Sequence, residues 1–401
     1  MALYLGNKKV AVTNTIEKQI PSMKAFFEAG GKCAYSRATS FEGCWQYDDT
    51  ANVTNMNQMF YRCPSIVTLP MMNTSNVTNM ESFVDSGYST SGYSQLKTIP
   101  LLDTSKVTNM KRMFAGTYEL SSIPQLNTSS VTNMDYIFEF TPNLKSIPLL
   151  DTSNVTSMRG AFSQCGVERL PALNLSKCES FYETFKQSKL LSFDNTTTIK
   201  VVDMTSAFQY SKSLTSVRIS TDSCTIMYST FLGCSSLETV ELLNSNNIVR
   251  LNACFEDCAS LKSGPNITSE EIITMRAMFY GCTSLESVPL YNATKATDIA
   301  YMFYNCKLLT SIPAMNIENT PEVSGMFYYC SNLETIHMIN INASLDIHWS
   351  TKFTREALLE IIGNLVAQTS GNKTLDMGAT NLAKLTDEDK AIATNKGWTL
   401  A

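Results

Sequence analysis

A phenylalanine that recurs at an almost constant interval is the feature that most constrains how this chain can fold. Successive copies stand 23 or 24 residues apart, except for one gap of 31 residues between Phe83 and Phe114. A period in the twenties that continues over most of a chain predicts a stack of similar coils, each burying its apolar side chains against its neighbours. The twelve positions are Phe60, Phe83, Phe114, Phe138, Phe162, Phe185, Phe208, Phe231, Phe255, Phe279, Phe303 and Phe327.

Other columns of residues repeat in register with the phenylalanine. A leucine or isoleucine often stands six residues after it, a second apolar residue nine after it, and a proline such as Pro70 directly follows. This Leu-x-x-Ile-Pro step predicts a very short strand, which ends where proline offers no N–H to a ladder. The segment 151–158 is rich in turn residues, and the Met-x-x-Met-Phe stretch of the consensus predicts about one turn of helix.

The columns predict a repeat solenoid of about twelve coils of 23–24 residues over 41–345. Residues 1–40 lie outside the pattern and predict a hairpin over 3–12 and a short helix over 21–29, as a cap or attachment segment. Residues 346–401 predict a small α/β cap over the end of the solenoid core. We expect it to contain helices over about 355–368 and from Thr386 to Gly397, with strands near 373–377 and 398–400.

The cysteines occupy positions that suit a structural role. Seven of the twelve stand three residues after the phenylalanine, where the other repeats have serine or threonine, so the column requires a small side chain. The chain has no CxxC pair and only two histidines, which argues against a metal site. Mostly free thiols predict folding in a reducing compartment. The seven cysteines are Cys63, Cys165, Cys234, Cys258, Cys282, Cys306 and Cys330.

Composition excludes several classes of function. The net charge is −5 and no basic run occurs, so the sequence predicts no nucleic-acid partner. No apolar stretch reaches membrane-spanning length, and the first residues lack a hydrophobic signal core. The sequence contains no GxSxG, HExxH, P-loop or GxGxxG motif, and we interpret His337 and His348, with Asp346 nearby, as surface residues of the cap. We therefore predict no enzyme, cofactor or metal.

A row of tyrosines is the best candidate for a binding site. One residue after the repeat phenylalanine stand Tyr280, Tyr304 and Tyr328, with Tyr329 adjacent, whereas four earlier coils have alanine, glutamate, serine or lysine at that position. Packing therefore does not require tyrosine there. Exposed tyrosines could stack on a sugar or contact a protein partner. The alternative is that the rings only shield the coil edge near the cap.

The 31-residue gap contains a second candidate. Its extra residues, 86–94, are polar and rich in glycine and tyrosine. They fit a tolerated surface insertion, because lengthening a loop costs little free energy. They also fit a contact loop, in which Tyr88 and Tyr93 would meet the partner.

The repeat consensus resembles a known family. The unit Leu-Asp-Thr-Ser-Asn-Val-Thr-Asn-Met-x-x-Met-Phe-x-x-Cys-x-x-Leu-x-x-Ile-Pro closely resembles the BspA-like leucine-rich repeats of bacterial surface proteins, including many from gut bacteria and mycoplasmas. The resemblance covers about three quarters of the chain and implies a leucine-rich repeat solenoid. It also implies adhesion or host interaction, with a protein or a surface glycan as partner.

The ends carry a second resemblance. Residues 3–12 are similar to the start of tail-module proteins of phages and prophages from gut bacteria, and residues 353–400 look like the C-terminal cap of similar repeat proteins. This resemblance implies a receptor-binding module on a phage tail that contacts a bacterial surface and attaches through 1–40. Such a protein folds in the cytoplasm and acts in the virion or outside the cell without a signal peptide. The alternative is a cell-surface adhesin that binds host matrix or other bacteria.

Overall fold

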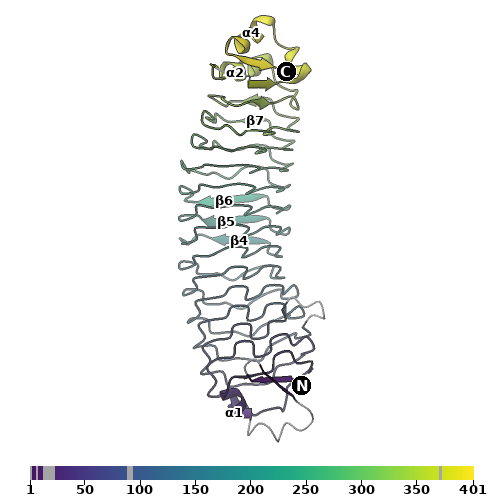
Figure 1. Ribbon diagram of the computed structural model, residues 1–401, viewed down its shortest axis with the longest axis vertical. Coiled ribbons are helices and arrows are strands. Elements are labelled where there is room, and N and C mark those ends of the chain that lie inside the picture. Colours follow the sequence, from purple (N-terminus) through teal and green to yellow (C-terminus); the bar gives the residue numbers. More distant parts are fainter. Residues whose placement is uncertain (1, 6–7, 12–22, 88–93, 370–372) are drawn as a thin grey trace. The chain divides into compact units, whose positions relative to one another are not determined.

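The computed structural model describes residues 2–5, 8–11, 23–87, 94–369 and 373–401. The chain forms two units, Met1–Leu191 and Ser192–Ala401. Within each unit, successive coils of the backbone stack in parallel, which confirms the predicted repeat solenoid (Figure 1). Tyr88 and Tyr93 lie outside the described residues.

The phenylalanine column forms the core of each unit. In unit 1 the ring centroid of Phe138 lies 5.7 Å from that of Phe114 and 5.6 Å from that of Phe162. In unit 2, Phe231 and Phe255 are 5.2 Å apart and their planes differ by 8°. These rings are almost fully buried. Aromatic contact between coils therefore replaces the single shared core of a globular domain.

The Met-x-x-Met-Phe stretch was expected to form a helical turn, and this prediction is wrong. Gln58 and Arg62 adopt positive φ angles of 58° and 53°, which no helix contains. The N–H of Met56 donates to the carbonyl of Asn79 at 2.9 Å, and that of Phe60 to Phe83 at 2.8 Å. The backbone thus bonds to the next coil, since a coil can satisfy most of its polar groups only through its neighbours.

The predicted short strands form only in some coils. At the Leu-x-x-Ile step the structure has β4, β5 and β6, which pair in parallel, and a second parallel pair, β7 and β8. In the described coils of unit 1 this step forms no regular strand, and most of these coils carry proline there. The coils of β4, β5 and β6 lack proline at this step, which leaves their backbone N–H groups free to join a ladder, whereas β7 ends directly before Pro313. The bounds are β4 Ser192–Asn195, β5 Ser216–Ser220, β6 Thr239–Leu243, β7 Ser311–Ile312 and β8 Thr335–Ile336.

The cysteine column lies inside the coils. All seven of its cysteines are free and buried, which confirms that they serve as small core side chains. The thiol of Cys282 donates to the carbonyl of Phe255 at 3.0 Å, and that of Cys330 to Phe303 at 2.9 Å. Burial raises the pKa of the Cys330 thiol to about 12. These thiols therefore stay protonated and act as weak hydrogen-bond donors between coils.

The N-terminal residues form the predicted hairpin and helix. Strand β1 (Ala2–Leu5) pairs antiparallel with β2 (Lys8–Ala11) and with β3 (Gly31–Lys32). Helix α1 spans Met23–Glu28, and a 3₁₀ turn, η2, spans Tyr47–Thr50. Short local signals in the sequence therefore suffice for this segment.

The C-terminal residues form a small α/β arrangement, as predicted. Strand β10 pairs in parallel with β9 and with β11. Thr354 caps α2, and Thr386 with Asp389 forms the expected capping box of α4. Arg355 joins the two helices through a bidentate ion pair with Asp389 at 2.6 and 2.8 Å. The bounds are β9 Leu345–Asp346, α2 Arg355–Gly363, β10 Lys373–Asp376, α3 Gly378–Leu382, α4 Asp387–Asn395 and β11 Trp398–Leu400. Helix α2 ends earlier than residue 368, the expected end.

Candidate functional site

The predicted tyrosines come together on one edge of unit 2. Tyr280, Tyr304 and Tyr328 each follow a phenylalanine that is buried in the core, and their own side chains are partly exposed. The rings of Tyr280 and Tyr304 stack with centroids 4.4 Å apart and planes 3° from parallel. The ring centroid of Tyr304 also lies 6.3 Å from that of Tyr328 and 5.2 Å from that of Tyr329. One tyrosine thus connects the whole row.

Trp349 extends this row beyond the repeats. Its ring lies 4.2 Å from that of Tyr329 and 6.4 Å from that of Tyr328. Tyr329 is 40% exposed and Trp349 37% exposed. We call this surface the aromatic ledge, and it consists of Tyr280, Tyr304, Tyr328, Tyr329 and Trp349. Sequence reasoning did not include Trp349, because it lies outside the repeat and no column indicated where its ring would point.

Raised pKa values keep the hydroxyl groups of Tyr304 and Tyr328 protonated. The carboxylate of Asp346 raises the pKa of Tyr328, and partial burial adds to the effect. Burial raises the pKa of Tyr304, and the neighbouring hydroxyl groups of Tyr280 and Tyr329 raise it further. A neutral phenol can both donate and accept a hydrogen bond. The ledge therefore offers ring surface together with hydroxyl groups, which is a combination suited to binding.

The two histidines lie in different surroundings. His337 Nδ1 is 2.7 Å from Glu360 on α2. His348 Nδ1 is 2.6 Å from Asp346, and its ring lies 4.7 Å from that of Trp349. His348 thus borders the aromatic ledge, whereas His337 makes a single contact with a helix.

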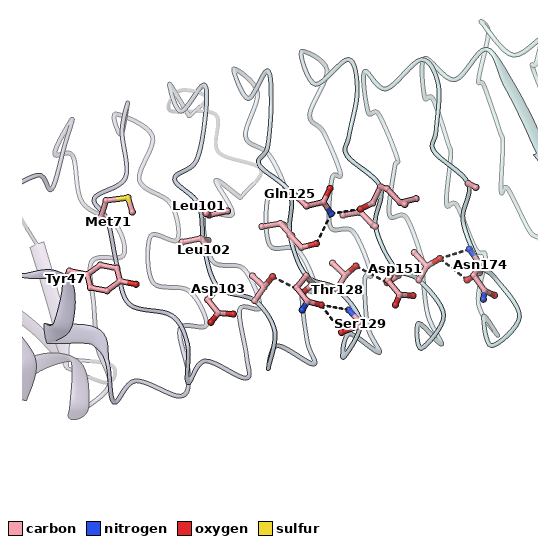
Figure 2. A pocket seen from close by; sticks show the side chains of 17 residues that line it. Tyr47, Met71, Leu101, Leu102, Asp103, Gln125, Thr128, Ser129, Asp151 and Asn174 are labelled. Atoms are coloured by element: carbon pink, nitrogen blue, oxygen red, sulfur yellow. Dashed lines mark hydrogen bonds between the residues drawn. The ribbon is translucent and has the colours of Figure 1, made fainter.

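A groove in unit 1 is a second candidate, and sequence reasoning missed it. Its volume is about 850 Å³, and its lining comes from successive coils (Figure 2). Along it lie three large apolar side chains with unusually high exposure: Met71 at 57%, Leu101 at 65% and Leu149 at 61%. We call this surface the Leu101 groove. Such a row is uncommon outside interaction sites.

Hydrogen bonds between coils hold the backbone of the Leu101 groove in place. The hydroxyl of Thr104 donates to the carbonyl of Asn127 at 2.8 Å, and that of Thr128 to Asp151 at 2.9 Å. These threonines are buried and belong to the lining of the groove. The groove is therefore preformed, which lowers the entropy cost of binding.

Carboxylates line the Leu101 groove beside the apolar row. Hydrogen bonds from Ser105 lower the pKa of Asp103, and those from Ser153 lower the pKa of Asp151. Both carboxylates are exposed and therefore charged at neutral pH. The groove thus combines apolar surface with negative charge.

One signal in the sequence could have revealed the Leu101 groove. Met71, Leu101 and Leu149 each directly follow a proline of the repeat, and Gln125 takes the same position in another coil. A column that accepts glutamine does not need an apolar side chain for the core. Its large apolar residues therefore indicate exposed surface, by the same argument that selected the tyrosines.

A profile of the family described as "Mycoplasma protein of unknown function, DUF285" matches residues 21–141, 88–194, 116–221, 176–269 and 225–339. These overlapping matches extend over more than half of the chain. The chain belongs to the DUF285 family. The predicted BspA-like leucine-rich repeat is thereby confirmed. A comparison with curated proteins found no match.

Solved structures of bacterial leucine-rich repeat proteins are similar to this DUF285 chain. A protein from Bacteroides ovatus is 16% identical, with 74% of this chain and 77% of that chain covered and a TM-score of 0.42. A leucine-rich cell surface protein from Faecalibacterium prausnitzii is 18% identical, with coverages of 71% and 76% and a TM-score of 0.32. A protein from Eubacterium ventriosum is 16% identical, with coverages of 78% and 87% and a TM-score of 0.37. At these TM-scores the chains do not superpose as wholes, so the assignment rests on the family match.

Leucine-rich repeat solenoids generally serve as binding scaffolds, because they present long regular surfaces. Within the described ranges of this chain, no helix combines the length and the apolar character needed to cross a membrane.

Proposed function

We propose that this DUF285 protein is a non-enzymatic binding protein that adheres to a macromolecule on a cell surface through the aromatic ledge. The observation that carries the proposal is the continuous row of partly exposed rings from Tyr280 to Trp349. Equivalent positions of four earlier coils hold alanine, glutamate, serine or lysine, so the fold does not need these rings. Tyrosine and tryptophan dominate the energetics of many protein interfaces.

The geometry of the ledge favours a protein partner over a stacked sugar. A sugar stacks on the open face of an aromatic ring, and Tyr280 and Tyr304 cover one face of each other at 4.4 Å. Ring edges and hydroxyls remain available, as at protein interfaces rich in tyrosine. The segment with Tyr88 and Tyr93 stays a separate proposal for a contact loop.

The Leu101 groove supports a second contact in the same function. Its exposed leucines and methionine suit the apolar stripe of a protein segment, and Asp103 with Asp151 would attract basic side chains beside that stripe. Such a segment would bind along the coils, as amphipathic helices bind in grooves. The groove thus adds contact area of a chemical type different from that of the ledge.

Two settings of the binding function remain as proposals. One is a cell-surface adhesin that binds host matrix or other bacteria, which accords with the BspA-like repeat. The other is a receptor-binding module of a phage or phage-like tail, carried by residues 1–40. The terminal resemblance favours this second setting, and β1 with β2 forms a hairpin where that resemblance begins. Residues 41–345 would supply the contact surfaces, and 346–401 would cap them.

Binding to whole cells tests the proposed function. We would incubate the fluorescently labelled protein with a panel of gut bacteria and mycoplasmas, and with surfaces coated with host matrix proteins. Saturable binding to a subset of cells or to matrix protein is expected, and prior protease treatment of the target should abolish it. Staining restricted to particular bacterial strains would favour the phage setting, and matrix binding the adhesin. Absence of saturable binding throughout the panel would contradict the proposal.

A further inference from the structure

Three side chains with metal-binding donor atoms meet at the C-terminal cap of unit 2. The ligand atoms of Asp346, His348 and Asp376 all lie within 4.8 Å of one another. His348 Nδ1 is 2.6 Å from Asp346 Oδ1 and 3.7 Å from Asp376 Oδ2. Asp346 and His348 belong to one segment, two residues apart, whereas Asp376 stands about thirty positions later, so only the fold brings Asp376 to the other two.

The strand register explains this convergence. Asp346 ends β9 and Asp376 ends β10, and these two residues are directly paired in the parallel sheet. Paired residues of neighbouring strands place their side chains on the same face. The chain then turns after Asp346, and the backbone N–H of His348 donates to Asp346 Oδ1 at 3.1 Å. The imidazole is thereby held over the two carboxylates.

The charge of this cluster is unbalanced. Neither carboxylate forms an ion pair with a lysine or an arginine in the part of the chain that the structure describes. Two neighbouring carboxylates repel each other unless a cation is shared between them. Backbone N–H groups orient both, because His348 N–H donates to Asp346 and Gly378 N–H donates to Asp376 Oδ1 at 3.1 Å. Asp376 Oδ2, which faces the imidazole, remains available.

We propose that Asp346, His348 and Asp376 bind a divalent transition-metal ion of the Zn²⁺ type. Two carboxylate oxygens and one imidazole nitrogen form a donor set suited to Zn²⁺, and three protein ligands leave at least one coordination position open. The ion would take the place of the proton shared by His348 Nδ1 and Asp346. The backbone donors to the carboxylates would act as the supporting hydrogen bonds that metal sites commonly have.

The site would adjoin the aromatic ledge. His348 is 4.7 Å from Trp349 and 6.3 Å from Tyr328, measured between ring centroids. An open coordination position there could accept a carboxylate or hydroxyl oxygen of a partner bound to the ledge. Metal binding itself does not depend on the proposed function, so the two can be tested separately. Sequence reasoning excluded metal because it counted histidines and cysteines, and no spacing connects Asp376 with His348.

The buried thiols would not compete for the ion. Burial raises the pKa of the Cys234 thiol to about 12 and that of Cys330 to about 12. Metal binding needs the thiolate, which is scarce at neutral pH under these conditions. Cys44 is the one partly exposed cysteine. A Cys44→Ser background therefore removes the most accessible thiol from the experiment.

Calorimetric titration of the full chain with Zn²⁺, after removal of bound metal with a chelator, tests the proposal. We expect one saturable site per chain in the Cys44→Ser background. Asp376→Asn and His348→Ala should each weaken binding at least about tenfold, since even loss of an outer hydrogen-bond partner has this effect. His337→Ala is the matched control, because His337 faces the single carboxylate of Glu360 at 2.7 Å.

Circular dichroism must show that the variants remain folded, and Zn²⁺ should raise the melting temperature of the parent but not of His348→Ala. The proposal would be overturned by the absence of saturable heat, by unchanged affinity in both ligand variants, or by an equal loss in His337→Ala. Cell binding by the ledge can persist in any of these cases, so failure here is distinct from failure of the proposed function.

Discussion

The Leu101 groove of unit 1 and the aromatic ledge of unit 2 are built from the same repeat but from different columns of it. The groove uses the residue after the proline, where Leu101 and Leu149 are exposed. The ledge uses the residue after the phenylalanine, where Tyr280 and Tyr304 stack. In unit 1 the column after the phenylalanine carries mixed residues, and in unit 2 the column after the proline does so. The repeat therefore fixes the core, and its outward columns are free to differ.

The two surfaces also differ in the chemistry that they offer. The groove has aliphatic side chains beside the charged carboxylates of Asp103 and Asp151. The ledge has aromatic rings with hydroxyl groups and the Asp346 carboxylate at its end. A single fold thus presents two kinds of binding surface, without a change in the coils that support them.

The largest effect is expected when a phenylalanine of the core column is substituted in each unit, because both surfaces are built on this column. Phe138→Ala in unit 1 and Phe255→Ala in unit 2 should each lower the free energy of unfolding by about 3–5 kcal/mol. Both rings are buried between the rings of the adjacent coils. Urea unfolding followed by circular dichroism measures the change. A loss below about 1 kcal/mol at either position would show that the column does not carry the core there.

A smaller effect is expected when the Leu101 groove is made polar. Leu101→Asp with Leu149→Asp should change the free energy of unfolding by no more than about 0.5 kcal/mol per site, because both side chains are mostly exposed. The same variant should bind less of the neutral apolar dye Nile red, measured by fluorescence. Leu290→Asp is the control, since Leu290 is 57% exposed and follows a proline in unit 2. If Leu290→Asp lowered Nile red binding as much as the double variant, the Leu101 groove would not differ from other exposed apolar surface of the protein.

The sequence predicted what is periodic or local. The phenylalanine and cysteine columns, the hairpin of β1 and β2, and the caps at Thr354 and Thr386 depend on spacing or on adjacent residues. The helical turn after Met56 was wrong, because residues with positive φ interrupt it and every second N–H bonds to the next coil. The short strands were predicted too widely: the longest, β4 to β6, lie in coils without proline at this step, whereas most described coils of unit 1 carry proline and form none.

The candidate sites were predicted only in part. The four tyrosines of the ledge belong to the repeat, so their neighbourhood followed from the period. Trp349 and the cluster of Asp346 with Asp376 depend on how the cap folds against itself, which no column encodes. The Leu101 groove could have been predicted in the same way, from the residues that follow the proline of the repeat. The tyrosines drew attention because aromatic rings signal binding more strongly than leucine does.

The most direct test of the central claim is a binding isotherm on whichever cell or matrix target the protein recognises. Tyr304→Ser with Tyr329→Ser is compared with Tyr228→Ser, a tyrosine in unit 2 that is 50% exposed and lies outside the ledge. The double variant should bind about thirtyfold more weakly, as the loss of about 2 kcal/mol at an interface hot spot implies, with its melting temperature nearly unchanged. The control should bind as the parent does. Unchanged binding by the double variant would contradict the assignment of the ledge as the contact surface.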